Sequence, residues 1–137
     1  MNVDGAQVAS KDSSRPWTLW IWDILSPQPL AVVDFRDRIK QLLWHPTAPE
    51  ILLILTIQKE PLVYVWHTTK EQLLILEGLT LNGDAGPGDY EAKWLACTNE
   101  LTLLFLTSPH QYDAGTIDIG GDNVNFQSVL RQANPGA

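Results

Sequence analysis

The stretch Thr18–Asp23 (TLWIWD) decides the fold class, because it is rich in aromatic and β-branched residues. Such side chains pack well on a pleated surface and therefore favour a β-strand. The segment 26–29 (SPQP) follows shortly after, and its prolines stop a helix as well as a central strand. The segment 18–23 is therefore predicted to be a strand that ends in a turn.

Short apolar runs separated by turn residues continue along the whole chain. The runs are about five to seven residues long, whereas helices average ~11 residues. The run Ile51–Ile57 (ILLILTI) is apolar at nearly every position, which predicts a strand covered on both faces. The sequence thus predicts an all-β fold with strands near 6–10, 18–23, 30–35, 39–44, 51–57, 62–66, 73–76, 91–97, 101–107 and 116–119.

Composition restricts the class of protein. The 137 residues carry a net charge of −7 and are 45% hydrophobic, so a packed core is expected, and nucleic acid or an acidic membrane surface is a poor partner. No apolar stretch reaches the roughly 18 residues of a spanning helix. The single cysteine and the three scattered histidines match no disulfide or zinc pattern. We expect no cofactor, no metal and a cytoplasmic setting.

An internal period is the most informative pattern. The segments Trp20–Asp23 and Tyr64–His67 both place an aromatic, an aliphatic and a tryptophan before a polar residue, and Trp22 and Trp66 are 44 residues apart (66 − 22). Trp44 and Trp94 are 50 residues apart, and a Gly-rich insertion accounts for the excess. A period of roughly 40–45 residues with four strands per unit is typical of WD-repeat propeller blades.

The residues themselves resemble this family. Leu19–Asp23 resembles the third strand of a WD repeat, and Leu42–Pro46 resembles the end of the first strand of the next blade. The stretch Ser10–Asp23, with Leu30–Val33 and Trp44–Pro46, is similar to the late blades of the WD repeat-containing protein 8 group. The resemblance covers about residues 6–119 and assigns structural WD-type positions to Trp22, Asp23, Trp44, Pro46 and Trp66.

The resemblance also implies a function. Members of that group act at spindle poles and centrosomes, so it implies a non-catalytic protein-interaction scaffold at the cytoskeleton. The implied partners are a coiled-coil anchoring protein and microtubule-minus-end machinery. Two departures stand out: 36–38 (RDR) and 88–90 (GDY) replace the usual Gly-His, and Trp66-His67 replaces Trp-Asp. The buried Asp-His-Ser/Thr-Trp network of regular blades is therefore expected to be absent.

The period divides the chain into blade-like segments. We expect a partial blade start and loop at 1–17, the remainder of that blade at 18–38 and a complete blade at 39–78. A Gly-rich insertion at 79–89, an incomplete blade at 90–119 and a flexible tail at 120–137 follow. This gives between two and three four-stranded antiparallel blades, too few to close a ring of about four to eight. The missing blades would come from the rest of a parent chain or from another chain. The alternative is a truncated product without independent function.

Candidate chemistry is weak. The segment 83–88 (GDAGPG) lacks the Gly-Lys-Ser/Thr of a phosphate loop and is interpreted as a connecting loop. A β-rich hydrolase remains the alternative function, and its candidate groups would be the paired carboxylates Asp34 and Asp37 and the histidines His45 and His67, with Cys97 as a possible metal ligand. Solvated turns, strand-end caps and a buried thiol explain the same residues better.

The tryptophans are the sharpest candidates for binding. Trp22, Trp44 and Trp66 recur at strand positions, which favours core filling. Trp20 shares the face of Trp22, since the two are separated by one residue in a strand. Trp17 follows a proline in a turn and is the candidate exposed anchor for a protein partner, because aromatic residues are enriched at interface hot spots.

Overall fold

The structure is a computed structural model that describes residues 1–58, 62–79, 81, 89–98, 101–120 and 122–132. Strands dominate it, which confirms the all-β prediction. No helix among these residues has the length and apolarity needed to cross a membrane. In chain order the elements are β1 (Gln7–Lys11), β2 (Thr18–Asp23), β3 (Pro29–Asp34), β4 (Ile39–Trp44), β5 (Ile51–Thr56), β6 (Val63–His67), β7 (Gln72–Glu77), β8 (Glu91–Thr98), β9 (Leu101–Thr107), β10 (Tyr112–Gly120), β11 (Asn123–Ser128) and α1 (Val129–Gln132).

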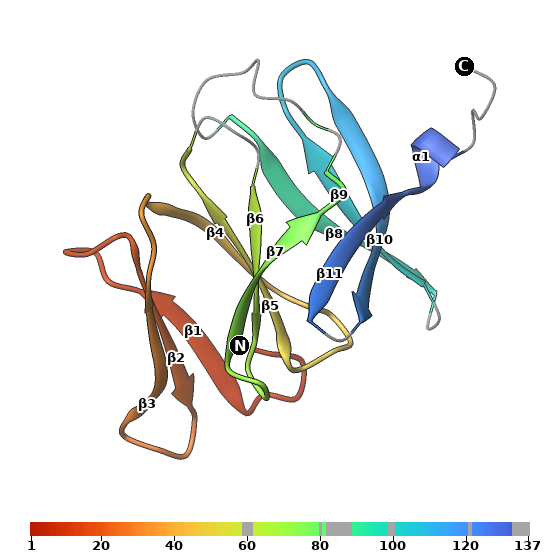
Figure 1. The fold of residues 1–137 in the computed structure, drawn as a ribbon. Coiled ribbons are helices and arrows are strands. Elements are labelled where there is room, and N and C mark those ends of the chain that lie inside the picture. Colours follow the sequence, from red (N-terminus) through yellow and green to blue (C-terminus); the bar gives the residue numbers. More distant parts are fainter. Residues whose placement is uncertain (59–61, 80, 82–88, 99–100, 121, 133–137) are drawn as a thin grey trace.

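The strands form two sheets. The first has the order β1-β2-β3, and the second has the order β4-β5-β6-β7-β11-β10-β9-β8. All neighbours pair antiparallel except β7 and β11, which pair in parallel over Leu76 with Val124 and Glu77 with Asn125. The larger sheet thus consists of two antiparallel halves, β4–β7 and β8–β11, and Figure 1 shows the small sheet and these halves side by side.

Side chains bring the two edges of the larger sheet together. Lys40 Nζ on β4 donates to the carbonyl of Tyr90, 2.7 Å away. The amide of Gln41 bonds the backbone of Ala92 twice: Nε2 donates to the carbonyl at 3.1 Å, and Oε1 accepts from the N–H at 2.9 Å. Because the Gln41 side chain pairs as a backbone amide would, the sheet is nearly closed between β4 and β8.

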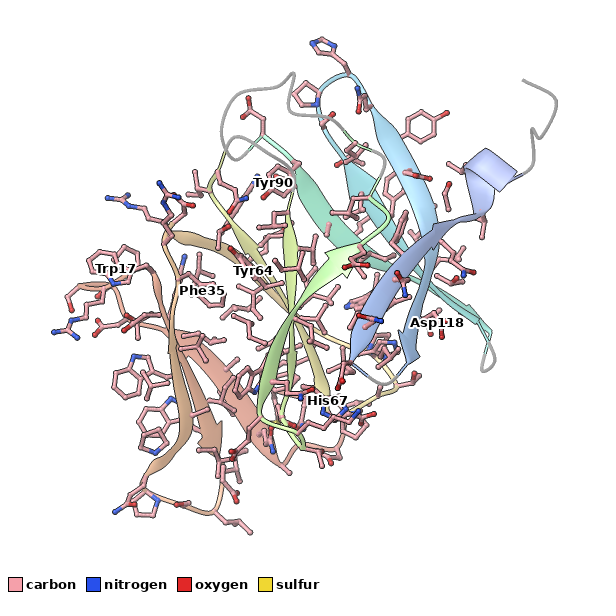
Figure 2. All side chains as sticks on the ribbon, viewed as in Figure 1. Trp17, Phe35, Tyr64, His67, Tyr90 and Asp118 are labelled. Atoms are coloured by element: carbon pink, nitrogen blue, oxygen red, sulfur yellow. The ribbon has the colours of Figure 1, made fainter. Side chains whose placement is uncertain are left out.

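Two apolar clusters lie between the three units. The first fills the space between the halves β4–β7 and β8–β11, and the second lies between β1–β3 and β4–β7. Phe35 and Tyr64 meet in the second, with ring centroids 4.9 Å apart, and Figure 2 shows both between the small sheet and its neighbour. Strand β5 contributes to both clusters, and Ile51–Leu55 are all 0% exposed. This confirms the prediction of a strand covered on both faces.

The C-terminal part corrects the sequence-based expectation. A flexible tail was expected from Gly120, but β11 and the short helix α1 lie there, and β10 is longer than the expected strand at 116–119. The last unit therefore has four strands where three were expected. Val124 and Phe126 are buried in the first cluster, so two apolar side chains fix a segment whose Asn and Gln residues suggested a loop. The expected insertion at 82–88 and residues 133–137 lie outside the described residues.

Candidate protein-interaction face

The outer surface of the small sheet carries the two central tryptophans of β2. Leu19 and Ile21 are buried in the second cluster, and because side chains alternate along a strand, Trp20 and Trp22 lie on the opposite side. Their rings stack with centroids 5.8 Å apart and planes 16° apart. Neither belongs to a buried cluster, so the half-buried pair of rings lies on the side of the small sheet that faces away from the core.

Neighbouring strands extend this surface. On β1, Val8 lies opposite Trp22 and Ser10 lies opposite Trp20, and on β3, Val32 lies opposite Trp20. The Ser10 hydroxyl accepts a hydrogen bond from Trp22 Nε1 at 3.1 Å, and Val32 is 49% exposed. We call these five residues the tryptophan face. It is an ordered aromatic surface with one polar group and no covering layer among the described residues.

A shallow hollow of about 360 Å³ adjoins the tryptophan face, between the two tryptophans, Ser10, Lys11 and Asp12. The backbone N–H and the hydroxyl of Ser14 donate to the Asp12 carboxylate, both at 2.9 Å, and these bonds hold the pKa of Asp12 below its ordinary value. Lys11 Nζ donates to the carbonyl of Ile39 at 3.1 Å. The Asp12 carboxylate is therefore held in place at the rim of an apolar surface, whereas the Lys11 ammonium is directed toward β4.

The ladder of the small sheet recurs in the larger one. Strands β1 and β2 pair from Gln7 with Asp23 to Lys11 with Leu19, and β5 and β6 pair from Ile51 with His67 to Leu55 with Val63. Every residue number in the second ladder exceeds its counterpart in the first by 44 (7 to 51, 23 to 67). The 44-residue period of the sequence is thus a repeat of five strand pairs in identical register.

This equivalence gives the tryptophan face a counterpart. Its residues on β1 and β2 correspond to Leu52, Ile54, Tyr64 and Trp66, which pack in the second cluster beneath the small sheet. One position differs in chemistry: Ile54 replaces Ser10, and Trp66 Nε1 is buried without a hydrogen-bond partner among the described residues. The same kind of face is covered by a sheet in one unit and uncovered in the other.

The structure places the predicted WD-type residues in different surroundings. Trp66 is buried and Trp44 packs against the second cluster, which confirms core filling for both. Trp22 instead lies on the outer face, where core filling was expected. Asp23 Oδ1 accepts from the N–H of Leu25 at 3.0 Å in the turn after β2, and Pro46 is exposed in the turn after β4.

Trp17 lies in the turn before β2, and its side chain is 41% exposed. Its carbonyl accepts from the N–H of Phe35 at 2.9 Å, which fixes the backbone of the turn. Figure 2 shows Trp17 at the outer edge of the small sheet, pointing away from the core. Its exposure agrees with the sequence-based expectation, and its role as an anchor stays a prediction.

The candidate hydrolytic residues have structural partners. Asp34 accepts from the Thr18 hydroxyl at 2.6 Å, and Asp37 lies in the turn before β4. His45 follows β4 and His67 ends β6, on either side of Ile51, and their Nδ1 atoms accept from backbone N–H groups of the adjacent turns. The described residues contain no group of three or more side chains able to hold a metal, and the side chain of Cys97 lies outside them.

His45 has the most distinctive surroundings of these residues. Its Nδ1 accepts from the N–H of Thr47 at 3.1 Å and of Ala48 at 2.9 Å, and its ring lies 4.8 Å from the ring of Trp94 on β8. Burial lowers the pKa of His45, and the charge of Glu50 opposes this shift in part. The neutral ring suits these contacts, because a protonated Nδ1 cannot accept a hydrogen bond.

Several features of the structure have little or no signal in the sequence. The alternation in β2 indicates that Trp20 and Trp22 share a face, but not that this face is the uncovered one. The Gln41 contact with Ala92 joins residues 51 positions apart and has no local pattern.

A scan against known protein-family models finds no match to this chain, and a search of curated proteins finds none either.

Proposed function

We propose that this chain is a non-catalytic protein-interaction scaffold that docks a partner protein on the tryptophan face. The observation that carries the proposal is the 44-residue equivalence of the two ladders: the corresponding face of β5 and β6 is buried under a sheet, whereas the tryptophan face is uncovered. Tryptophan side chains contribute a large apolar area when a partner covers them, and they are enriched at interface hot spots.

The equivalence also indicates the kind of partner. The face of β5 and β6 is covered by the inner side of the small sheet, which presents Leu19, Ile21 and Phe35. The proposed occupant of the tryptophan face is therefore a second antiparallel sheet that presents a similar aliphatic and aromatic surface. Aligned sheets pack about 10 Å apart with interdigitated side chains, so this geometry suits a flat sheet better than a single helix.

The repeated units are proposed to be WD-type blades. Support comes from the five strand pairs offset by 44 residues and from the antiparallel order within each unit. The hydrogen bond from Trp22 to Ser10 is of the Ser/Thr-Trp kind found in regular WD repeats, although the sequence predicted that this network would be absent. Trp44 and Trp94 give further support, because they occupy similar places. Trp44 packs against the cluster between β1–β3 and β4–β7, and Trp94 packs against the cluster between β4–β7 and β8–β11.

A place at spindle poles, with a coiled-coil anchoring protein and microtubule-minus-end machinery as partners, is proposed from the sequence resemblance alone. The test is the location of the fluorescently tagged full chain in dividing cells stained for a centrosomal marker. Enrichment at the poles that is lost in the double variant Trp20→Ala/Trp22→Ala supports the proposal. A uniform cytoplasmic distribution of a folded chain contradicts this setting but leaves the docking proposal intact.

Site-specific photo-crosslinking tests the docking face. A benzophenone amino acid placed at Val32 samples the tryptophan face, and the same probe at Thr116 samples the outer side of the β8–β11 half as a matched control. We expect crosslinked peptides from Val32 that map to a β-sheet of a partner, with few from Thr116. Equal labelling from both positions, or labelling from Val32 that Trp20→Ala/Trp22→Ala leaves unchanged, would refute the proposal.

A further inference from the structure

Strand β1 has an open edge on the side that does not face β2. Gln7 marks this side: its N–H donates to Asn2 Oδ1 and its carbonyl accepts from the N–H of Asn2, both at 2.9 Å. Backbone groups alternate in direction along an antiparallel strand, so those of Ala9 and Lys11 point to the same side as those of Gln7. Among the described residues, no strand pairs with this edge.

The equivalent edge of β5 is paired. Strand β4 lies along it, with Trp44 opposite Leu52, Leu43 opposite Leu53 and Gln41 opposite Leu55. These residues of β5 correspond to Val8, Ala9 and Lys11 through the offset of 44.

The ends of the two edges also match. The carbonyl of Ile51 accepts from the N–H of His45 at 3.0 Å, just as the carbonyl of Gln7 accepts from Asn2. Asn2 thus corresponds to His45, the residue that follows β4, and among the described residues no strand lies along the rest of the β1 edge.

The size of the tryptophan face gives a second reason to expect a ligand at this edge. Three strands about 4.8 Å apart, each rising about 3.3 Å per residue over five residues, cover roughly 14 by 17 Å, or about 240 Å². Stable interfaces bury about 800 Å² on each partner. A partner seated on the tryptophan face therefore needs a further contact, and β1 lies at the margin of that face.

We infer that the open edge of β1 accepts an extended strand from a partner protein, which pairs antiparallel with Val8–Lys11 as β4 pairs with β5. This inference rests on the proposed scaffold function and specifies its partner as one that donates a strand. By analogy with β4, the donated strand carries large apolar side chains opposite Val8 and Ala9 and a polar one opposite Lys11. Such strand addition obtains affinity from backbone hydrogen bonds and specificity from alternate side chains.

The surroundings of β1 allow this pairing. Lys11 lies opposite Leu19, which is buried beneath the small sheet, so its side chain leaves over the inner face toward the carbonyl of Ile39. It does not lie along the edge. Ala9 has a small side chain on the same inner face, where it packs against the second cluster.

The probe for the test is a fluorescent synthetic peptide with the sequence of residues 39–46 (IKQLLWHP), added to the intact protein. We expect saturable binding by fluorescence anisotropy and slower hydrogen exchange at the backbone amides of Ala9 and Lys11. The variant Ala9→Pro removes the outward N–H and leaves the bonds to β2 in place, so it should weaken binding at least tenfold. The matched control Ala9→Ser keeps the N–H and should bind as the wild type does.

A second pair of probes keeps the test decisive if Ala9→Pro fails to fold. The peptide is N-methylated at the amides that pair with β1, or at the intervening amides that point away. The inference is supported if binding is lost with the peptide methylated at the pairing amides and is kept with the peptide methylated at the intervening amides. No binding of the parent peptide, or binding equally reduced by both methylation patterns, overturns it. A dimer of this chain that is lost in Ala9→Pro would also overturn it, because the edge would then serve a second copy. If the peptide does not bind but crosslinking from Val32 still occurs, strand addition at β1 is refuted and docking on the tryptophan face is not.

Discussion

Removal of one hydroxyl, in Tyr90→Phe, should loosen the contact between the two halves of the larger sheet. Tyr90 precedes β8 and is 3% exposed in the first cluster. Its hydroxyl lies 3.0 Å from the carbonyl of Thr56 and accepts from the N–H of Leu62 at 3.2 Å, so one side chain connects the start of β8 to the end of β5 and the start of β6. Phenylalanine keeps the ring but leaves both backbone groups without this partner.

The size of the effect follows from those two groups. Leaving buried hydrogen-bonding groups unsatisfied costs about 1–3 kcal/mol, a large share of the roughly 5–15 kcal/mol by which domains are stable. With a urea dependence of about 2 kcal/mol per molar, the unfolding midpoint should fall by about 0.5–1.5 M. Tyr112→Phe is the matched control, because the side chain of Tyr112 is 65% exposed and its loss should cost less than about 0.5 kcal/mol.

High pH supplies an independent check on Tyr90. Burial raises the pKa of Tyr90 above its ordinary value of 10.0, an effect that the hydrogen bond from Leu62 opposes in part. A group whose pKa is higher in the folded state stabilises the fold below its unfolded pKa and loses this contribution as pH rises through the folded value. The stability gap between wild type and Tyr90→Phe should therefore narrow above pH 10. A midpoint unchanged by Tyr90→Phe, or one lowered equally by Tyr112→Phe, would refute the reasoning.

Three further predictions concern the core, a turn and a histidine. Leu53→Ala should lower the free energy of unfolding by about 2–5 kcal/mol in urea titrations, whereas Leu73→Ala, 38% exposed, should cost less than about 1 kcal/mol. Gly78→Ala should cost about 1–3 kcal/mol, measured by thermal unfolding, because Gly78 has φ of +88° and a Cβ there would lie 2.5 Å from the carbonyl oxygen of Phe126. Burial lowers the pKa of His45, so the stability that the neutral ring contributes is present above its unfolded pKa of about 6.5 and is lost as pH falls through the folded value. In His45→Gln, the urea midpoint of unfolding should therefore fall less between pH 7.5 and pH 5 than it does in the wild type. An equal fall in both proteins would contradict this role.

Local patterns in the sequence predicted most of the strands because a strand is a local feature. The bounds of β2, β4 and β9 agree with the expected ranges, and the continuous apolar run of β5 correctly indicated burial on both faces. The spacing of Trp22 and Trp66 gave the period that the strand register repeats. Strand β11 escaped prediction because the Asn, Gln and Gly residues of this segment indicated a loop, although its buried Val124 and Phe126 alternate with polar residues as in a half-buried strand.

The sequence by itself determined the all-β class, the repeat of 44 residues and the fact that Trp20 and Trp22 share one face. Only the tertiary structure decided that this face is uncovered while its counterpart around Trp66 is buried, that β7 meets β11 in parallel, and that Gln41 joins β4 to β8. The physical reason is the range of each interaction. Alternation along a strand is set by neighbours two positions apart, whereas the covering of a face depends on which distant sheet packs against it.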